Sequence, residues 1–147
     1  MQRQIRYQGA IVREDHILLI KHRHHADGRD YWLIPGGGIE DGETEEQCVQ
    51  REMREETNLE VVVERLVLEQ TAWPDDQIYA AYRTFLCRPT GGEARPGYEP
   101  EPGAASVYSI SEVGWFDLRD EAAWNDHIKR DPFTYPSLKK LQAALGY

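Results

Sequence analysis

The sequence has little cysteine and no long apolar run. Its only two cysteines, Cys48 and Cys87, have no CxxC spacing and form no dense framework, which favours reduced thiols in a cytosol. No apolar stretch follows the basic N-terminal residues, so no secretory signal is recognised. These absences predict a cytoplasmic protein that has no membrane partner.

Basic residues are also scarce. The 147 residues contain 17 Lys and Arg against 26 Asp and Glu, a net charge of -9. A nucleic-acid polymer is therefore not expected as a partner, because such binding normally needs a basic face. The length suits one domain, predicted over 1–147. Nine acids lie between 40 and 60 with only two bases, so that stretch is either a solvated helix face or a cation site.

Hydrophobic patterning predicts strands on both sides of a glycine-rich loop and an acidic helix. Thr44 and Gln47 match a capping box, which places a helix start at about Glu45, and Asn58 suits its end. Pro35 to Gly38 should break regular structure, and Pro89 to Gly103 should form a long surface loop without helix or central strand. The expected strands are 5–13, 17–20, 31–34, 61–70, 77–87 and 113–118. Two C-terminal helices are expected at 121–127 and 137–145.

Three carboxylates, those of Glu52, Glu55 and Glu56, share one face of the predicted helix. In an isolated Glu-x-x-Glu-Glu, neighbouring arginines such as Arg51 and Arg54 usually neutralise such a face. The nearby triglycine instead favours a cation site, because glycine lets the backbone approach the carboxylates. Hard divalent cations prefer such oxygen ligands.

The full pattern is Gly37-x5-Glu43-x7-Arg51-Glu52-Met53-Arg54-Glu55-Glu56-Thr57-Asn58-Leu59. It resembles the Nudix box of the Nudix hydrolase superfamily, and the spacing agrees throughout. The one departure is Asn58, where the family usually has glycine. Asn tolerates the left-handed conformation, so the departure changes little.

The resemblance implies an α/β fold, an α/β/α sandwich with a mixed β-sheet and a loop-helix-loop catalytic motif. It implies Mg²⁺- or Mn²⁺-dependent hydrolysis of a nucleoside diphosphate linked to another moiety. The implied metal ligands are Glu52, Glu55, Glu56 and the carbonyl of Gly36. Arg51 would orient a catalytic carboxylate, and Glu43 would support the loop and helix. The general base is Glu52 or a later acid among Glu99, Glu101 and Glu112, and we favour Glu52.

The substrate is not determined by the box. An ADP-ribose-like compound or a sugar nucleotide is favoured, and Pro74, fifteen residues past Leu59, resembles a spacing of ADP-ribose-type relatives. The alternatives are pyrophosphohydrolysis of oxidised nucleoside triphosphates and a non-catalytic nucleotide sensor. Weaker substrate-binding candidates are Arg23, Trp73 and Glu112. Many relatives form homodimers, so a homodimer is a further option.

Histidines and aromatic residues outside the box suggest no separate site. His22, His24 and His25 match no zinc spacing and are expected at a solvated or phosphate-contacting strand end. Trp32, Trp73, Tyr79 and Trp115 could stack on a base, but aromatic residues in a small α/β domain are more often core.

Overall fold

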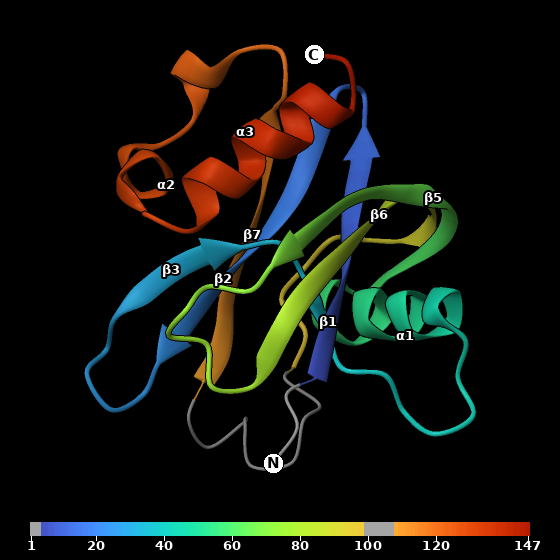
Figure 1. Cartoon of the computed structure of the whole chain (residues 1–147). Coiled ribbons are helices and arrows are strands. Elements are labelled where there is room, and N and C mark those ends of the chain that lie inside the picture. Colours follow the sequence, from blue (N-terminus) through green and yellow to red (C-terminus); the bar gives the residue numbers. More distant parts are fainter. Residues whose placement is uncertain (1–3, 99–107) are drawn as a thin grey trace.

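The computed structural model describes residues 4–98 and 108–147, which form a β-sheet with helices on both of its faces (Figure 1). The elements in chain order are β1 (Gln4–Arg13), β2 (His16–His24), β3 (Asp30–Leu33), β4 (Gly36–Gly37), α1 (Glu45–Thr57), β5 (Leu59–Thr71), β6 (Tyr79–Gly92), β7 (Tyr108–Asp117), the short 3-10 helix η2 (Glu121–Ala123), α2 (Asp126–Arg130) and α3 (Thr134–Ala144).

The sheet is mixed. Its main path runs β3-β2-β1-β6-β5, while β4 pairs with β1 and β7 pairs with β2. The β1–β6 pair is parallel and the other pairs are antiparallel. At the turn of the β1–β2 hairpin, Glu14 and Asp15 take positive φ angles of 51° and 64°.

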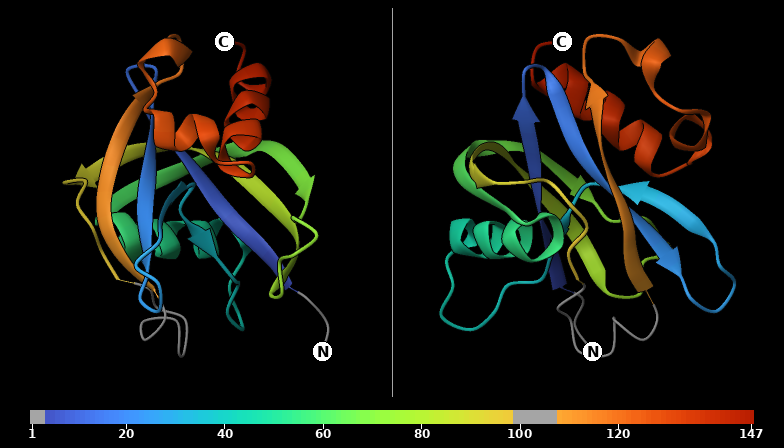
Figure 2. Two further views of the ribbon diagram at one scale, coloured as in Figure 1. Left: turned by 90° about the vertical axis from the view of Figure 1, so that its left-hand side faces the viewer. Right: turned by 180° about the vertical axis from the view of Figure 1, so that it is seen from behind.

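Two hydrophobic cores lie on opposite faces of this sheet. Successive side chains of a strand point to opposite faces, so Leu18 of β2 joins the core beneath α1 with Met53. Its neighbour Leu19 joins the core beneath α2 and α3 with Leu138. Figure 2 shows α1 on one side of the strands and α3 on the other. The predicted α/β/α sandwich is confirmed.

The glycine loop is more regular than predicted. Gly36 and Gly37 form the short strand β4, which pairs with Gln8 and Tyr7 of β1. A Cβ added at Gly36 would lie 2.3 Å from the Tyr7 carbonyl oxygen. The two backbones can therefore pair this closely only because Gly36 has no side chain.

The surface loop predicted from Pro89 to Gly103 starts later than expected, because β6 continues to Gly92. Pairing between β1 and β6 ends at Ile11 and Cys87, so the rest of β6 is an edge, where proline is tolerated. Residues 93–98 have no regular structure, as predicted. The remainder of the predicted loop, 99–103, lies outside the described residues.

The prediction of one continuous helix at 121–127 is also wrong. The chain there forms η2 and then α2, separated by Trp124 and Asn125. Trp124 is buried and its indole N–H donates to the Asp117 carbonyl over 2.7 Å. The Asn125 side chain accepts from the Ile128 N–H and starts α2. The next helix, α3, begins at Thr134, earlier than predicted, with Pro136 in its first turn, where proline is tolerated.

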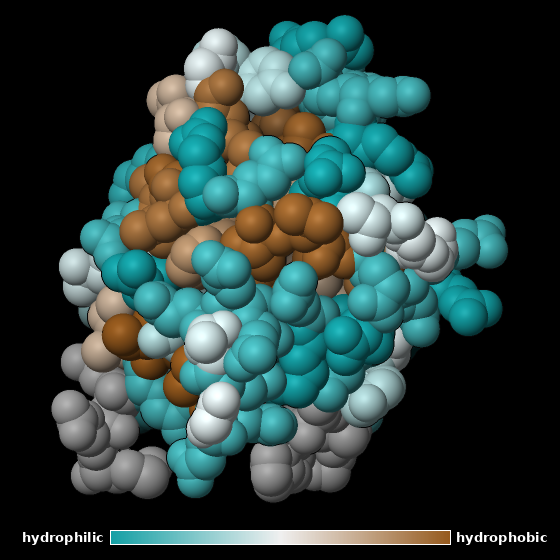
Figure 3. Space-filling view, turned by 90° about the vertical axis from the view of Figure 1, so that its right-hand side faces the viewer, coloured by the Kyte–Doolittle hydropathy of each residue, from teal (hydrophilic) through white to brown (hydrophobic). Residues whose placement is uncertain are grey.

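The surface is mostly hydrophilic on the side where α1 and the bend of β5 lie. Figure 3 shows a band of hydrophobic side chains between hydrophilic ones on this face. Both cysteines are buried, and neither forms a disulfide within the described residues. No helix in the two described segments has the length and apolar composition needed to cross a membrane.

Candidate active site

Local contacts fix both ends of α1, the helix that carries the box carboxylates. At its start, the Gln47 N–H donates to Thr44 Oγ1 over 3.1 Å and the Thr44 N–H donates to Gln47 Oε1 over 2.9 Å. At its end, Asn58 has a φ angle of 64° and its N–H donates to the Arg54 carbonyl over 3.0 Å. The capping box is confirmed, and Asn58 takes the left-handed conformation that glycine usually supplies.

Two of the box carboxylates are buried against β4. Glu52 and Glu56 are 0% exposed. The Gly36 N–H donates to Glu56 Oε1 over 2.8 Å, and a Cβ added at Gly37 would lie 2.4 Å from Glu52 Oε1. A residue without a side chain is therefore needed at Gly37, beside the Glu52 carboxylate. The glycine loop and the helix face meet as predicted, and the role of the Gly36 carbonyl stays a prediction.

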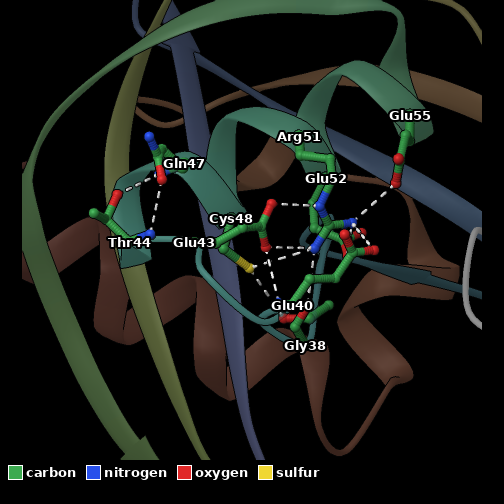
Figure 4. A network of polar contacts seen from close by, with 10 residues as sticks. Gly38, Glu40, Glu43, Thr44, Gln47, Cys48, Arg51, Glu52 and Glu55 are labelled. Atoms are coloured by element: carbon green, nitrogen blue, oxygen red, sulfur yellow. Dashed lines mark hydrogen bonds and ion pairs between the residues drawn. The ribbon is translucent and has the colours of Figure 1, made fainter.

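Arg51 joins the acidic residues of the loop and the helix (Figure 4). Its guanidinium donates twice to Glu43, from Nε over 2.7 Å and from Nη2 over 3.0 Å. Nη1 donates to Glu52 Oε1 over 3.0 Å and to Glu55 Oε2 over 3.1 Å. Nη2 also donates to the Gly38 carbonyl over 3.0 Å. One planar cation thus holds four groups in a fixed arrangement, which lysine could not do with its single ammonium group.

Hydrogen bonding within this network stabilises the charged forms of Arg51 and Glu43. Hydrogen bonding to Glu43 raises the pKa of Arg51, and hydrogen bonding from Arg51 lowers the pKa of the Glu43 carboxyl. Glu40 adds a fourth carboxylate, 3.6 Å from Arg51 Nη1. One guanidinium against four carboxylates leaves a formal charge of -3. Such an excess of clustered negative charge favours a bound cation.

The chemistry of the cluster fits a divalent metal ion. Buried carboxylates normally pair with a cation or coordinate a metal, and both Glu52 and Glu56 are buried. The Glu52 carboxylate lies so close to Gly37 that an added Cβ there would come within 2.4 Å of its Oε1. Within residues 4–98 and 108–147, no three His, Cys, Asp or Glu side chains already stand as a set of metal ligands. Glu52 and Glu55 both contact Arg51 instead, so joint ligation by the three glutamates requires side-chain rearrangement.

Other predicted site residues do not join this network through a hydrogen bond or ion pair in the described part of the chain. Arg23 is exposed on β2. Glu112 of β7 pairs with Lys21, 3.6 Å away. Trp73 is 41% exposed, donates to Asp75 and packs edge-on against Phe133. Glu99 and Glu101 lie outside the described residues. Substrate contacts by Arg23, Trp73 and Glu112 stay predictions.

Sequence reasoning missed a buried polar group beside β4. Arg6 and Gln8 are 9% and 4% exposed. Arg6 donates to Gln8 and to the Ile34 carbonyl, and Gln8 donates to Thr84 over 2.8 Å. Alternating polar residues at the start of a strand normally indicate a solvent face, so the pattern gave no signal of burial.

The expectation of a solvated strand end is wrong for His22. This residue is 6% exposed, and its ring lies 5.7 Å from that of Tyr31 and 5.6 Å from that of Tyr108. Burial, followed by the charge of Arg6, lowers the pKa of His22 to about 3. His22 is therefore neutral at pH 7. Trp32 and Tyr79 are buried, in agreement with the predicted core role, but that expectation is wrong for Trp73, which is 41% exposed.

The NUDIX domain family model matches residues 4–135. The chain belongs to the Nudix family. Hydrolases of this family act on pyrophosphate bonds, and they generally use divalent metal ions and substrates linked to a nucleoside diphosphate.

Curated relatives of this Nudix-family chain include longer proteins. The NAD-capped RNA hydrolase NudC of Vibrio vulnificus is 39% identical over 108 residues, which are 73% of this chain and 36% of that protein. The NudC of Photobacterium profundum is 40% identical over 91 residues, 61% of this chain and 32% of that protein. The chain thus spans about a third of the length of these relatives.

Solved structures match along nearly the whole chain. An ADP-ribose pyrophosphatase from Streptococcus suis aligns with a TM-score of 0.67 and 24% identity, over 99% of this chain and 94% of that one. A MutT Nudix hydrolase from Burkholderia pseudomallei aligns with a TM-score of 0.64 and 27% identity, over 95% and 98%. These similarities agree with the mixed sheet and the layers described above.

Proposed function

We propose that this Nudix hydrolase cleaves the pyrophosphate bond of a nucleoside diphosphate linked to another moiety, using Mg²⁺ or Mn²⁺. The observation that carries the proposal is the burial of Glu52 and Glu56 against the backbone of β4, with Arg51 holding Glu52 beside Glu55. A helix face that only needs solvent would not bury two acids at such cost.

Glu52, Glu55 and Glu56 would hold the metal, with the Gly36 carbonyl as a further ligand. A bound divalent ion neutralises the diphosphate and lowers the pKa of a bound water. In the reaction the water oxygen forms a bond to one phosphorus and the bridging P–O bond breaks, which leaves two phosphate products. Glu52 accepts the proton of the water, and Arg51 orients Glu52 because its Nη1 donates to Oε1 over 3.0 Å. Glu43 orients Arg51 in turn through two hydrogen bonds.

The favoured substrates are dinucleotide-like or sugar-linked diphosphates. The names of the relatives support this class, because NAD and ADP-ribose both contain adenosine diphosphate linked to a second moiety. The NudC relatives are named for a capped RNA, and this name conflicts in part with our expectation that no nucleic-acid polymer is a partner. The net charge of -9 keeps the small molecule as the proposed substrate, because a polymer needs a basic surface.

Oxidised nucleoside triphosphates form the second candidate class. The similarity to the MutT Nudix hydrolase, at 27% identity, favours this alternative. A binding module without turnover is less well supported, because Glu43, Arg51, Glu52, Glu55 and Glu56 are all present and a pure binder has no need of the metal-binding acids.

The test is a turnover assay over NAD, ADP-ribose, sugar nucleotides, oxidised and normal triphosphates and a short NAD-capped RNA, with Mg²⁺ or Mn²⁺. The Glu52→Gln variant removes the buried carboxylate. Glu46→Gln is the matched control, because Glu46 is an exposed acid on the same helix.

We expect Glu52→Gln to lower kcat by about 10²–10⁴-fold, the usual contribution of a general base, and Glu46→Gln to have little effect. Equal turnover by wild type and Glu52→Gln would refute the role of Glu52. Metal-dependent binding of one ligand without hydrolysis would favour the sensor alternative, and preference for the capped RNA over NAD would overturn the small-molecule assignment.

A further inference from the structure

The segment after β6 lies against the end of the helix that carries the box acids. We call residues 93–98 the strap, which runs past the end of α1 in the right-hand view of Figure 2. Three strap N–H groups donate to the last three helical carbonyls: Arg95 to Thr57 over 3.1 Å, Gly97 to Glu56 over 2.9 Å and Tyr98 to Glu55 over 3.0 Å. A helix end leaves such carbonyls without intrahelical donors. The strap therefore completes the hydrogen bonding of the last turn of α1.

Asn58 ties the strap to the helix a second time. Its side-chain amide donates to the carbonyls of Arg95 and Pro96 over 3.1 and 3.3 Å. Glycine could adopt the same backbone conformation at this position, but it has no amide to donate. The one departure from the box pattern thus supplies two contacts that the usual residue cannot make.

The strap is held by its backbone rather than by apolar packing. Ala94 is the member that packs against the hydrophobic core, while Glu93, Arg95, Pro96 and Tyr98 are exposed. Gly97 is needed for the close approach, because an added Cβ would lie 1.8 Å from the Glu55 carbonyl oxygen. The contact is therefore specific to the backbone of Glu55 and its neighbours.

The position of this contact has a consequence for the site. Glu55 and Glu56 lie in the last turn of α1, where helices fray unless their ends are satisfied. Fraying would change the direction of both side chains relative to Glu52, one turn earlier. The β4 contact holds the carboxylate of Glu56 at one point, and the strap holds the backbone from which it projects.

We propose that the strap, tethered by Asn58, is a positioning element that sets the metal affinity of Glu55 and Glu56. The proposal rests on the proposed function, in which these carboxylates bind the metal. Outer contacts that orient metal ligands typically change metal affinity by about 10–100-fold, so loss of the strap should weaken metal binding by at least about tenfold. Saturating metal should then restore most of the turnover.

The experiment compares Gly97→Ala, Asn58→Gly and Gly91→Ala with wild type. Gly97→Ala forces the strap away from Glu55, and Asn58→Gly removes only the amide donors. Gly91→Ala is the matched control, because a Cβ there meets only Glu60, at 3.9 Å. Mn²⁺ dissociation constants are measured by electron paramagnetic resonance without substrate. Amide hydrogen exchange of Gly97 and Tyr98 reports whether the strap is attached, and circular dichroism reports folding.

We expect Gly97→Ala to raise the Mn²⁺ dissociation constant by about tenfold, Asn58→Gly to raise it less, and Gly91→Ala to leave it unchanged. Unchanged Mn²⁺ affinity in both strap variants, with faster exchange at Gly97 or Tyr98, would overturn the proposal and leave the proposed function intact. If Gly97→Ala does not fold, wild-type affinity in Asn58→Gly decides against the proposal. No Mn²⁺ binding by wild type would instead refute the proposed function, and the strap proposal with it.

Discussion

Replacement of Gly37 by alanine tests whether the backbone of β4 sets the position of the Glu52 carboxylate. The new Cβ would lie 2.4 Å from Oε1, 2.6 Å from Cδ and 2.8 Å from Oε2 of Glu52. Ordinary contacts of a Cβ begin at 3.4 Å, so the carboxylate must retreat by about 1 Å, the difference between 3.4 and 2.4 Å. Glu52 is 0% exposed, so the surrounding atoms must move with it.

The expected effect follows from this displacement. A misplacement of about 1 Å at a reacting group can cost about 10²-fold in rate, which corresponds to about 2.7 kcal/mol of activation free energy. Overpacking should also lower the free energy of unfolding by about 1–3 kcal/mol. We therefore expect kcat/KM to fall by about 10²-fold in a protein that still folds at 25 °C.

The assay measures kcat/KM with Mg²⁺ together with thermal unfolding, and Gly38→Ala is the matched control. A Cβ at Gly38 would meet only the end of the exposed Gln4 side chain, 2.6 Å from its Oε1, which can move away. Equal kcat/KM for the two alanine variants would refute the reasoning, because the adjacent substitutions differ in their contact with Glu52.

Two further predictions concern pH. Hydrogen bonding from Arg51 lowers the pKa of Glu43 in the folded chain, so this contact stabilises the protein above the unfolded value of about 4.3 and is lost as the pH falls through the folded pKa. In urea unfolding the difference between wild type and Glu43→Gln should shrink below about pH 4.3, and a constant difference would contradict this. Burial lowers the pKa of His22 to about 3. The contribution of neutral His22 to the free energy of unfolding should therefore be fully present above about pH 6.5 and should decline as the pH falls toward 3. His22→Gln should flatten that decline, and an unchanged slope would argue against a buried neutral His22.

The sequence was most informative where contacts are local. The capping box of Thr44 and Gln47 and the left-handed Asn58 predicted both ends of α1, because each signal acts within four residues of the chain. The same spacing placed Glu52, Glu55 and Glu56 on one helix face, and it linked Glu43 with Arg51 through the resemblance to the Nudix box. These predictions needed no knowledge of what packs against the helix.

The tertiary structure decided the features that depend on residues far apart in the chain. Gly36 and Gly37 became a strand because β1 offers them a partner, and β6 extends past Pro89 because β5 continues alongside it. Composition at 121–127 indicated a helix, but burial of Trp124 interrupts it. Polar residues such as Arg6 and His22 proved to be buried, and the ring of His22 packs against those of Tyr31 and Tyr108.

The sequence by itself therefore determined the family, the helix and the set of acids, because these depend on spacing along one segment. Only the tertiary structure decided how deeply Glu52 and Glu56 are buried and which backbone groups surround them. The contact between the strap and the end of α1 is an example of a feature that only the tertiary structure decides. Asn58 and Gly97 are 39 residues apart in the sequence, and no local pattern indicates that they meet at the end of this helix. Burial and hydrogen bonding between distant segments arise only when the whole chain packs, since they depend on the relative placement of elements rather than on local propensity.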